Sequence, residues 1–167
     1  MKRRLMVPLM AAALTVAAVP AVAPAAKPKK PMGDVRGQIE ASADGTSATV
    51  RVTYRCYASD HLWVSLKQSA SGKKDWRLRD EGSSERAATW LQSHRNPFTC
   101  DGTKRTESFS VDLVEPGSKG ALVHGRAYLQ FCLTSSADES LEVYEKKFLW
   151  VHLGGQQGGG GEVEHPS

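Results

Sequence analysis

Alternation of apolar and polar residues is clearest between residues 49 and 57. Val50, Val52, Tyr54 and Cys56 fall on one parity of this segment, while threonine and arginine occupy the other parity. Successive side chains of a β-strand point to opposite faces of a sheet, so this period of two indicates a strand with one buried face. The pattern therefore predicts a strand that carries the thiol of Cys56 into the core.

The same alternation predicts further strands at a spacing of roughly ten residues, which is typical of an all-β sandwich or barrel. We expect strands at residues 35–41, 61–67, 106–113 and 122–134.

Parity also predicts which side chains of these strands are buried. Leu62, Val64 and Leu66 share one face of their strand, so we expect them in the core and expect Trp63 to point away from it. In the segment 106–113, the side chains expected to point inward are Phe109, Val111 and Leu113.

Three other segments are harder to assign. Residues 75–80 are strongly charged, with Trp76 and Leu78 on one parity, and we predict a short strand at a sheet edge, where charge discourages further pairing. The pattern of residues 84–94 fits a helix and a strand equally. Residues 136–144 carry a possible helix start, but we predict a loop over 136–141 and a closing strand over 148–153.

The ends of the chain have a different composition from its centre. Residues 1–25 combine a basic start, an apolar run and the small residues Ala23 and Ala25, which predicts a signal peptide that is cleaved after Ala25, or alternatively after Ala23. An uncleaved membrane anchor is the competing interpretation, and Pro8 and Pro20 argue against it. We expect a charged, proline-rich linker at 26–33, a domain at 34–153, and a glycine-rich disordered tail at 154–167.

Cleavage changes the charge balance of the chain. The 22 Lys and Arg residues lose Lys2, Arg3 and Arg4 with the signal peptide, so 19 basic residues remain against 18 acidic ones. The net charge falls from +4 to +1, which gives no support for nucleic-acid binding. We therefore predict a secreted protein with no nucleic-acid partner and, after cleavage, no association with a membrane.

Three cysteines would enter an oxidising compartment, where one disulfide is expected to form. An immunoglobulin-type bridge would join Cys56 to Cys132, but Cys132 lies on the polar parity of its strand, beside Gln130. Loop-closure entropy does not choose between the partners of Cys56, because a bridge to Cys100 or to Cys132 is worth about 4 or about 4.5 kcal/mol.

Four short motifs resemble those of a family of small exported actinobacterial proteins with no assigned function. They are Tyr54-Arg55-Cys56, Leu66-Lys67-Gln68, Cys100-Asp101-Gly102 and Gly125-Arg126-Ala127, and the similarity spans residues 38–133. The resemblance implies an immunoglobulin-like antiparallel β-sandwich of about seven strands. It also implies a disulfide between Cys56 and Cys100, with Cys132 as a departure from the family pattern.

The sequence contains no motif for a reaction, a cofactor or a metal. No serine or cysteine lies in a nucleophile elbow, and the histidines lack the spacing of metal ligands, with His94 expected alone in a loop. We therefore predict no enzyme activity, no catalytic residue, no cofactor and no metal site.

The remaining candidate for function is a group of aromatic and cationic residues that could form a ligand-binding face: Trp63, Trp76, Arg77, Arg79 and Trp90. Tryptophans on a β-sandwich can stack on sugar rings or anchor a protein partner. The alternative is that each ring covers the core beneath a loop. We expect an extracellular binding or interaction module for a glycan or a protein. The second hypothesis is an inhibitor of a secreted hydrolase that acts through residues 92–99.

Overall fold

The computed structural model describes residues 29–80, 82–95 and 98–154, and the predicted signal peptide lies outside these ranges. The described chain is all-β, with no α-helix and two short 3-10 helices, η1 (Trp76–Arg79) and η2 (Ser83–Glu85). Its strands are β1 (Met32–Val35), β2 (Ile39–Ala41), β3 (Ala48–Arg55), β4 (His61–Gln68), β5 (Thr89–Arg95), β6 (Arg105–Val111), β7 (Gly125–Thr134) and β8 (Leu141–Leu153).

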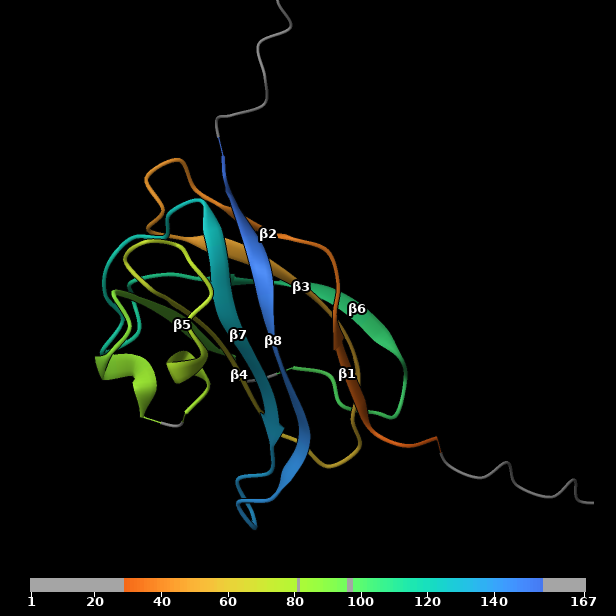
Figure 1. Ribbon diagram of the computed structural model, residues 1–167. Helices are drawn as coiled ribbons and strands as arrows, with labels where there is room; N and C mark the ends of the chain where they lie inside the picture. The colour runs from red at the N-terminus through yellow and green to blue at the C-terminus, as the bar shows by residue number, and fades with distance from the viewer. Residues whose placement is uncertain (1–28, 81, 96–97, 155–167) are drawn as a thin grey trace, which may run out of the picture.

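The eight strands form one mixed sheet, in the order β1-β3-β2-β8-β7-β4-β5, with β6 paired to the other edge of β3 (Figure 1). All pairs are antiparallel except β2 and β8, which run parallel from Ile39 opposite Val151 to Ala41 opposite Leu153. The prediction of an all-β fold of about seven strands is therefore confirmed at eight strands, but the prediction of purely antiparallel pairing was wrong.

The extra strand arises because the segment predicted as one strand, 35–41, is broken. β1 and β2 lie end to end along one edge of β3, and Gly37 between them has a φ of 83°, which favours glycine. The break lets β2 leave β1 and reach β8. The first strand also starts earlier than expected, since Met32 and Gly33 belong to β1 and not to a linker.

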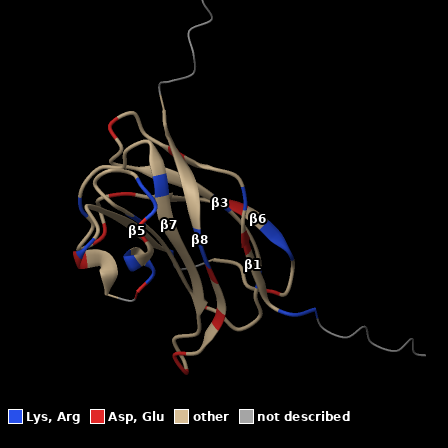
Figure 2. Ribbon diagram, viewed as in Figure 1, with Lys and Arg blue, Asp and Glu red and all other residues tan. Residues whose placement is uncertain are grey.

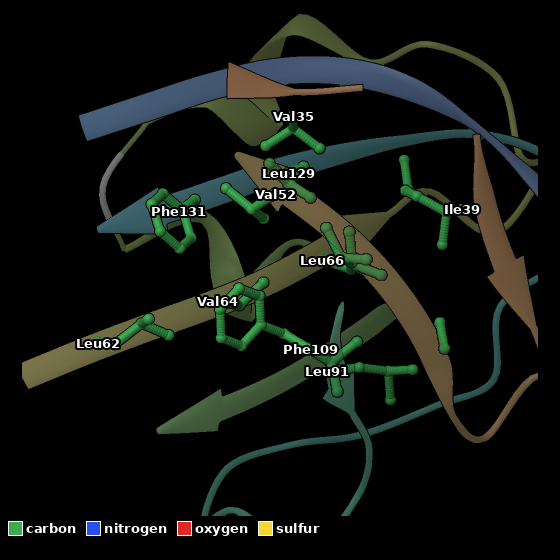
Figure 3. Close-up of a cluster of buried hydrophobic side chains, with 14 of the residues drawn as sticks. Val35, Ile39, Val52, Leu62, Val64, Leu66, Leu91, Phe109, Leu129 and Phe131 are labelled. Carbon is green, nitrogen blue, oxygen red and sulfur yellow. The ribbon is translucent and has the colours of Figure 1, made fainter. Parts of the chain in front are cut away.

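Strand β3 is the centre of the core, as its alternation predicted. Val50, Val52 and Tyr54 are buried, and the ring centroid of Tyr54 lies 6.1 Å from that of Phe131 on β7. Figure 3 shows Val52 and side chains of β4, β6 and β7 converging on the same space. Each fully buried aliphatic or aromatic side chain contributes about 2 kcal/mol by leaving water, so this cluster holds the two halves of the sheet together.

The hydroxyl of Tyr54 has a partner at the rim of this core. It donates a hydrogen bond of 3.0 Å to a carboxylate oxygen of Glu107. Burial, together with this hydrogen bond, raises the pKa of Tyr54 to about 12, so the hydroxyl remains a donor across the physiological pH range.

The predicted disulfide between Cys56 and Cys100 is confirmed, with Cα atoms 5.0 Å apart. Glu142, at the start of β8, stabilises the turn beside it. Its carboxylate accepts hydrogen bonds from the backbone amides of Tyr57, Ala58 and Ser59, at 2.7 to 3.1 Å. The disulfide therefore links the end of β3 to the segment before β6, and Glu142 links it to the start of β8.

The charged segment 75–80 and the two ambiguous segments contain 3-10 helices and strands. Residues 76–79 form η1 instead of an edge strand, because the side chain of Asp75 accepts the amide of Arg77 and starts a helical turn. Residues 84–94 end as strand β5 after η2, and β8 begins at Leu141, so neither uncertain segment contains an α-helix.

Leu113, predicted to point inward, lies beyond β6 and is 42% exposed. No helix of the described residues is long and apolar enough to cross a membrane.

Candidate functional site

The face of the sheet that points away from the core carries a second set of side chains. In the register of the sheet, Trp63 of β4 lies opposite His94 of β5 and Cys132 of β7, and Cys132 lies opposite Tyr144 of β8. Neighbouring strands are about 4.8 Å apart, so one row across four strands brings all four side chains to the same part of the surface. We call this surface the outer face.

A cavity of about 530 Å³ lies on the outer face. Its size is within the usual range for small-molecule sites. Strands β4, β5, β7 and β8 and the segment around η2 contribute its lining: His61, Trp63, Lys67, Gly82, Ser84, Trp90, His94, Gln130, Cys132, Thr134, Leu141 and Tyr144. Two indole rings and a phenol ring therefore share one concave site with amide, imidazole and ammonium groups.

Two polar atoms of the cavity lining have no hydrogen-bond partner among the described residues. Gln130 is 3% exposed, and its Nε2 donates to the hydroxyl of Tyr144 at 2.7 Å, but its Oε1 is without a partner. The buried Nε1 of Trp90 also has no hydrogen-bond partner among the described residues. A buried polar atom without a partner costs about 1–3 kcal/mol, so a ligand that reached Gln130 Oε1 or Trp90 Nε1 would offset that cost.

Trp63 is held in place by its own polar atom. Its Nε1 donates a 3.1 Å hydrogen bond to Oε1 of Gln92, and Nε2 of Gln92 donates to the carbonyl of Pro116 at 2.8 Å. The indole of Trp63 also stacks on the ring of His94, with centroids 6.2 Å apart. One ring of the cavity is thus fixed before any ligand arrives.

Lys67 places a cation at the edge of the cavity. It is 3% exposed, and its Nζ donates to Oγ of Ser83 at 3.0 Å, while that hydroxyl donates to the carbonyl of Leu78 at 2.8 Å. This chain of hydrogen bonds ties the segment that contains η1 and η2 to the sheet. It thereby fixes one wall of the cavity.

The imidazoles of His61 and His94 lie at the other end of the cavity, with ring centroids 5.1 Å apart. Nδ1 of His94 is 3.4 Å from a carboxylate oxygen of Glu115. The expectation that His94 stands alone in a loop was wrong, because β5 continues through Arg95 and pairs His94 with Trp63.

The predicted ligand face is divided by the structure. Trp63 and Trp90 line the cavity, whereas Trp76, Arg77 and Arg79 belong to η1, outside it. Arg77 pairs with Asp75 at 2.6 Å, and this partner lowers the pKa of Asp75 to about 2.

The division comes from a small hydrophobic cluster on the outer face. Leu78 and Ala87 pack with Tyr128, and Trp90 and Phe148 border them. The segment between β4 and β5 thus sits on the middle of the sheet, with the cavity on one side and Trp76 on the other.

Sequence reasoning missed His61, His94, Gln130 and Tyr144 as members of the site. His61 could have been found because it is two residues from Trp63 on β4, and Gln130 because it is two residues from Cys132 on β7. Residues two apart on a strand point to the same face, here the outer face. Tyr144 and His94 required the register of the sheet.

One group of described residues has the close spacing of metal ligands: Cys56, Cys100 and Glu142. Its two sulfur atoms are bonded to each other, and the carboxylate of Glu142 accepts backbone amides. Disulfide sulfurs are not thiolates, which are the sulfur ligands that metals bind, so the group serves as a structural anchor.

The molecule is therefore an all-β protein with a lined cavity on its outer face. No protein-family model matches the chain, and no curated protein matches it either.

Proposed function

We propose that this chain is an exported, non-enzymatic protein that binds a glycan in the outer-face cavity. The observation that carries the proposal is the combination of two indole rings with the buried Oε1 of Gln130 and Nε1 of Trp90, both without partners among the described residues. A sugar ring presents C–H groups that stack on aromatic rings and hydroxyls that both donate and accept hydrogen bonds. It therefore complements this lining better than a purely apolar ligand.

The proposed architecture is an immunoglobulin-like β-sandwich. In support, β1, β3 and β6 form one group of strands and β5, β4, β7 and β8 form another, and β2 pairs with both groups. The rings of Phe109 on β6 and Phe131 on β7 lie 6.0 Å apart across the core. Two packed groups of strands that enclose one core are the general plan of a sandwich.

Export is proposed on the predicted signal peptide and agrees with the disulfide, since disulfides persist mainly in oxidising compartments. A secreted location would also place the cavity where extracellular glycans are found.

The test is titration of the purified protein with a panel of neutral oligosaccharides, followed by tryptophan fluorescence. We expect at least one sugar to change the emission, and we expect Trp63→Ala to weaken its binding about tenfold or more, as removal of a central aromatic anchor does. Trp76→Ala is the matched control, because Trp76 lies outside the cavity, and it should bind as the parental protein does. Absence of any sugar effect, or equal binding by folded Trp63→Ala, contradicts the proposal.

Inhibition of a secreted hydrolase is the alternative function. Its predicted loop, residues 92–99, begins within β5, and residues 96–97 lie outside the described residues. The disulfide at Cys100 anchors the carboxyl end of this loop, which an inhibitory loop requires. Micromolar protein that leaves a panel of secreted proteases unaffected would remove this alternative.

A further inference from the structure

A row of exposed and half-buried rings and cations lies on the outer face beside the cavity. We call it the aromatic–cation ridge and define it by the rings of Trp76, Phe148 and Trp150 and by the cations of Lys74, Arg79, Arg126 and Lys146. Trp76 is 58% exposed and Trp150 is 43% exposed, although large aromatic side chains are normally well covered. Figure 2 shows basic positions on β7 and in the segment that contains η1.

The ridge is continuous along β8. The ring of Trp76 packs edge-on against Phe148, with centroids 5.3 Å apart, and Phe148 and Trp150 are two residues apart on the same side of the strand. Each cation lies against a ring. Lys74 Nζ is 3.7 Å from the centroid of Trp76, and the guanidinium of Arg126 is 4.4 Å from that of Trp150. Arg79 lies 5.3 Å from Trp76, and Lys146 lies 5.0 Å from Tyr144.

The two arginines of the ridge, Arg79 and Arg126, differ from most other arginines of the described residues. Arg77, Arg86, Arg95 and Arg105 each lie within 4.0 Å of a carboxylate. Among the described residues, none of the four ridge cations forms such an ion pair. A ring face attracts a cation but leaves its charge uncompensated. The rings therefore restrict long, flexible side chains in advance, which reduces the entropy lost when an anion binds.

The charges are spread along the ridge and are not concentrated at one point. Lys146 and Trp150, where Arg126 lies, are four residues apart on β8, or about 13 Å at the rise of a strand. A single small anion cannot contact both ends. The spacing fits an extended polymer that carries an anionic group at intervals.

We propose that the ridge binds an acidic polysaccharide, with uronate carboxylates on the cations and sugar C–H faces on the exposed edges of Trp76 and Trp150. A nucleic acid is a poorer fit, because double-stranded DNA carries a charge about every 1.7 Å along its axis, whereas the cations of the ridge are spread over about 13 Å. The ridge adjoins the cavity where Lys146 lies 5.0 Å from the ring centroid of Tyr144, but its ligand does not depend on the function proposed for the cavity.

The test measures binding of the purified protein to polygalacturonate by titration calorimetry at two salt concentrations. Binding should weaken as salt rises. Lys146→Glu and Lys74→Glu should each lower the affinity about tenfold, as loss of a charge-assisted contact does. Arg51→Glu is the matched control. Arg51 is exposed on β3, which belongs to the other group of strands, so the same charge change there should have no effect.

Three outcomes overturn the inference: no binding to polygalacturonate, equal losses in Lys146→Glu and Arg51→Glu, and tighter binding to single-stranded poly(dT) than to polygalacturonate. Thermal unfolding of each variant verifies that it is folded. Trp63→Ala should retain polygalacturonate binding, so failure of the cavity proposal and failure of the ridge proposal give different results.

Discussion

The cavity and the aromatic–cation ridge occupy the same face of the same sheet, yet they present tryptophan in opposite ways. In the cavity, Trp63 and Trp90 are partly covered, and polar groups without partners lie beside them. On the ridge, Trp76 and Trp150 are exposed and their partners are cations. The first environment suits one enclosed sugar ring, and the second suits a charged chain that lies across the surface.

The segment between β4 and β5 creates this difference. Leu78 packs on Tyr128 in the middle of the outer face, and Lys67 holds Ser83 against the sheet. A small hydrophobic cluster and a buried hydrogen bond therefore lie between the cavity and Trp76. The comparison shows that an inserted loop can determine the chemistry of a sheet face as much as the strands do.

The largest loss of stability is expected from removal of the disulfide. This change tests whether the cavity and the ridge unfold together in one cooperative transition. Cys56→Ala together with Cys100→Ala should lower the free energy of unfolding by about 4 kcal/mol, because the unfolded chain regains the entropy of the 44-residue loop. Urea denaturation measures the change. Treating the parental protein with a reductant should give a similar loss. Independent melting of the two surfaces would contradict a single cooperative unit.

Leu78→Ala should loosen the segment between β4 and β5 that lies between the cavity and Trp76. Leu78 is 1% exposed, and truncation of a buried leucine costs about 3 kcal/mol. The loss should be concentrated in the segment between β4 and β5, so hydrogen exchange should speed up there more than in β3. Val114→Ala is the control, since Val114 is 86% exposed and should change stability little. Uniform exchange across both regions would show that this segment does not open separately.

Glu142 allows the turn beside the disulfide to be altered without touching the ridge, because its carboxylate binds the amides of residues 57–59. Burial raises the pKa of Glu142, but hydrogen bonds from Ser59 and from the amides of Ala58, Tyr57 and Ser59 outweigh it, so the net pKa lies below its ordinary value of 4.5. The carboxylate thus contributes stability that is complete above the ordinary pKa and is lost as pH falls through the folded-state pKa.

Glu142→Gln should therefore lower the free energy of unfolding at pH 7 by about 1–2 kcal/mol. Its difference from the parental protein should shrink as the pH falls toward 3. Thermal unfolding across pH 3–7 tests this, with Glu85→Gln as an exposed control. A difference that stays constant with pH would show that the charge of Glu142 is not responsible.

Much of the sheet was predictable because alternate residues of a strand point to opposite faces, one buried and one exposed. Val50, Val52 and Tyr54 were assigned correctly, and so were Leu62, Val64 and Leu66, since each position needs only its own parity. The segment with Trp76 misled the same reasoning. Trp76 and Leu78 have strand parity, but the local hydrogen bond from the Arg77 amide to Asp75 starts a helical turn.

The two surfaces could not be separated from sequence alone. Their division depends on the contact of Leu78 with Tyr128, which are far apart in the chain, and on register pairs such as Trp63 with His94. Such contacts are set by tertiary packing, and the alternation of apolar and polar residues in the sequence does not indicate them. The disulfide partner of Cys56 was likewise undecided by loop entropy and was obtained from the resemblance.

The parallel pair of β2 and β8 has a consequence for how the chain reaches its native state. Lys147 on β8 donates to the carbonyl of Val35 across 112 residues of sequence, and β2 pairs with the last residues of β8. A polypeptide that emerges from its amino terminus cannot close this seam until its final strand is available. Proteins dominated by such distant contacts fold slowly, in milliseconds to seconds. The arrangement thus delays completion of the core until synthesis of β8 is nearly finished.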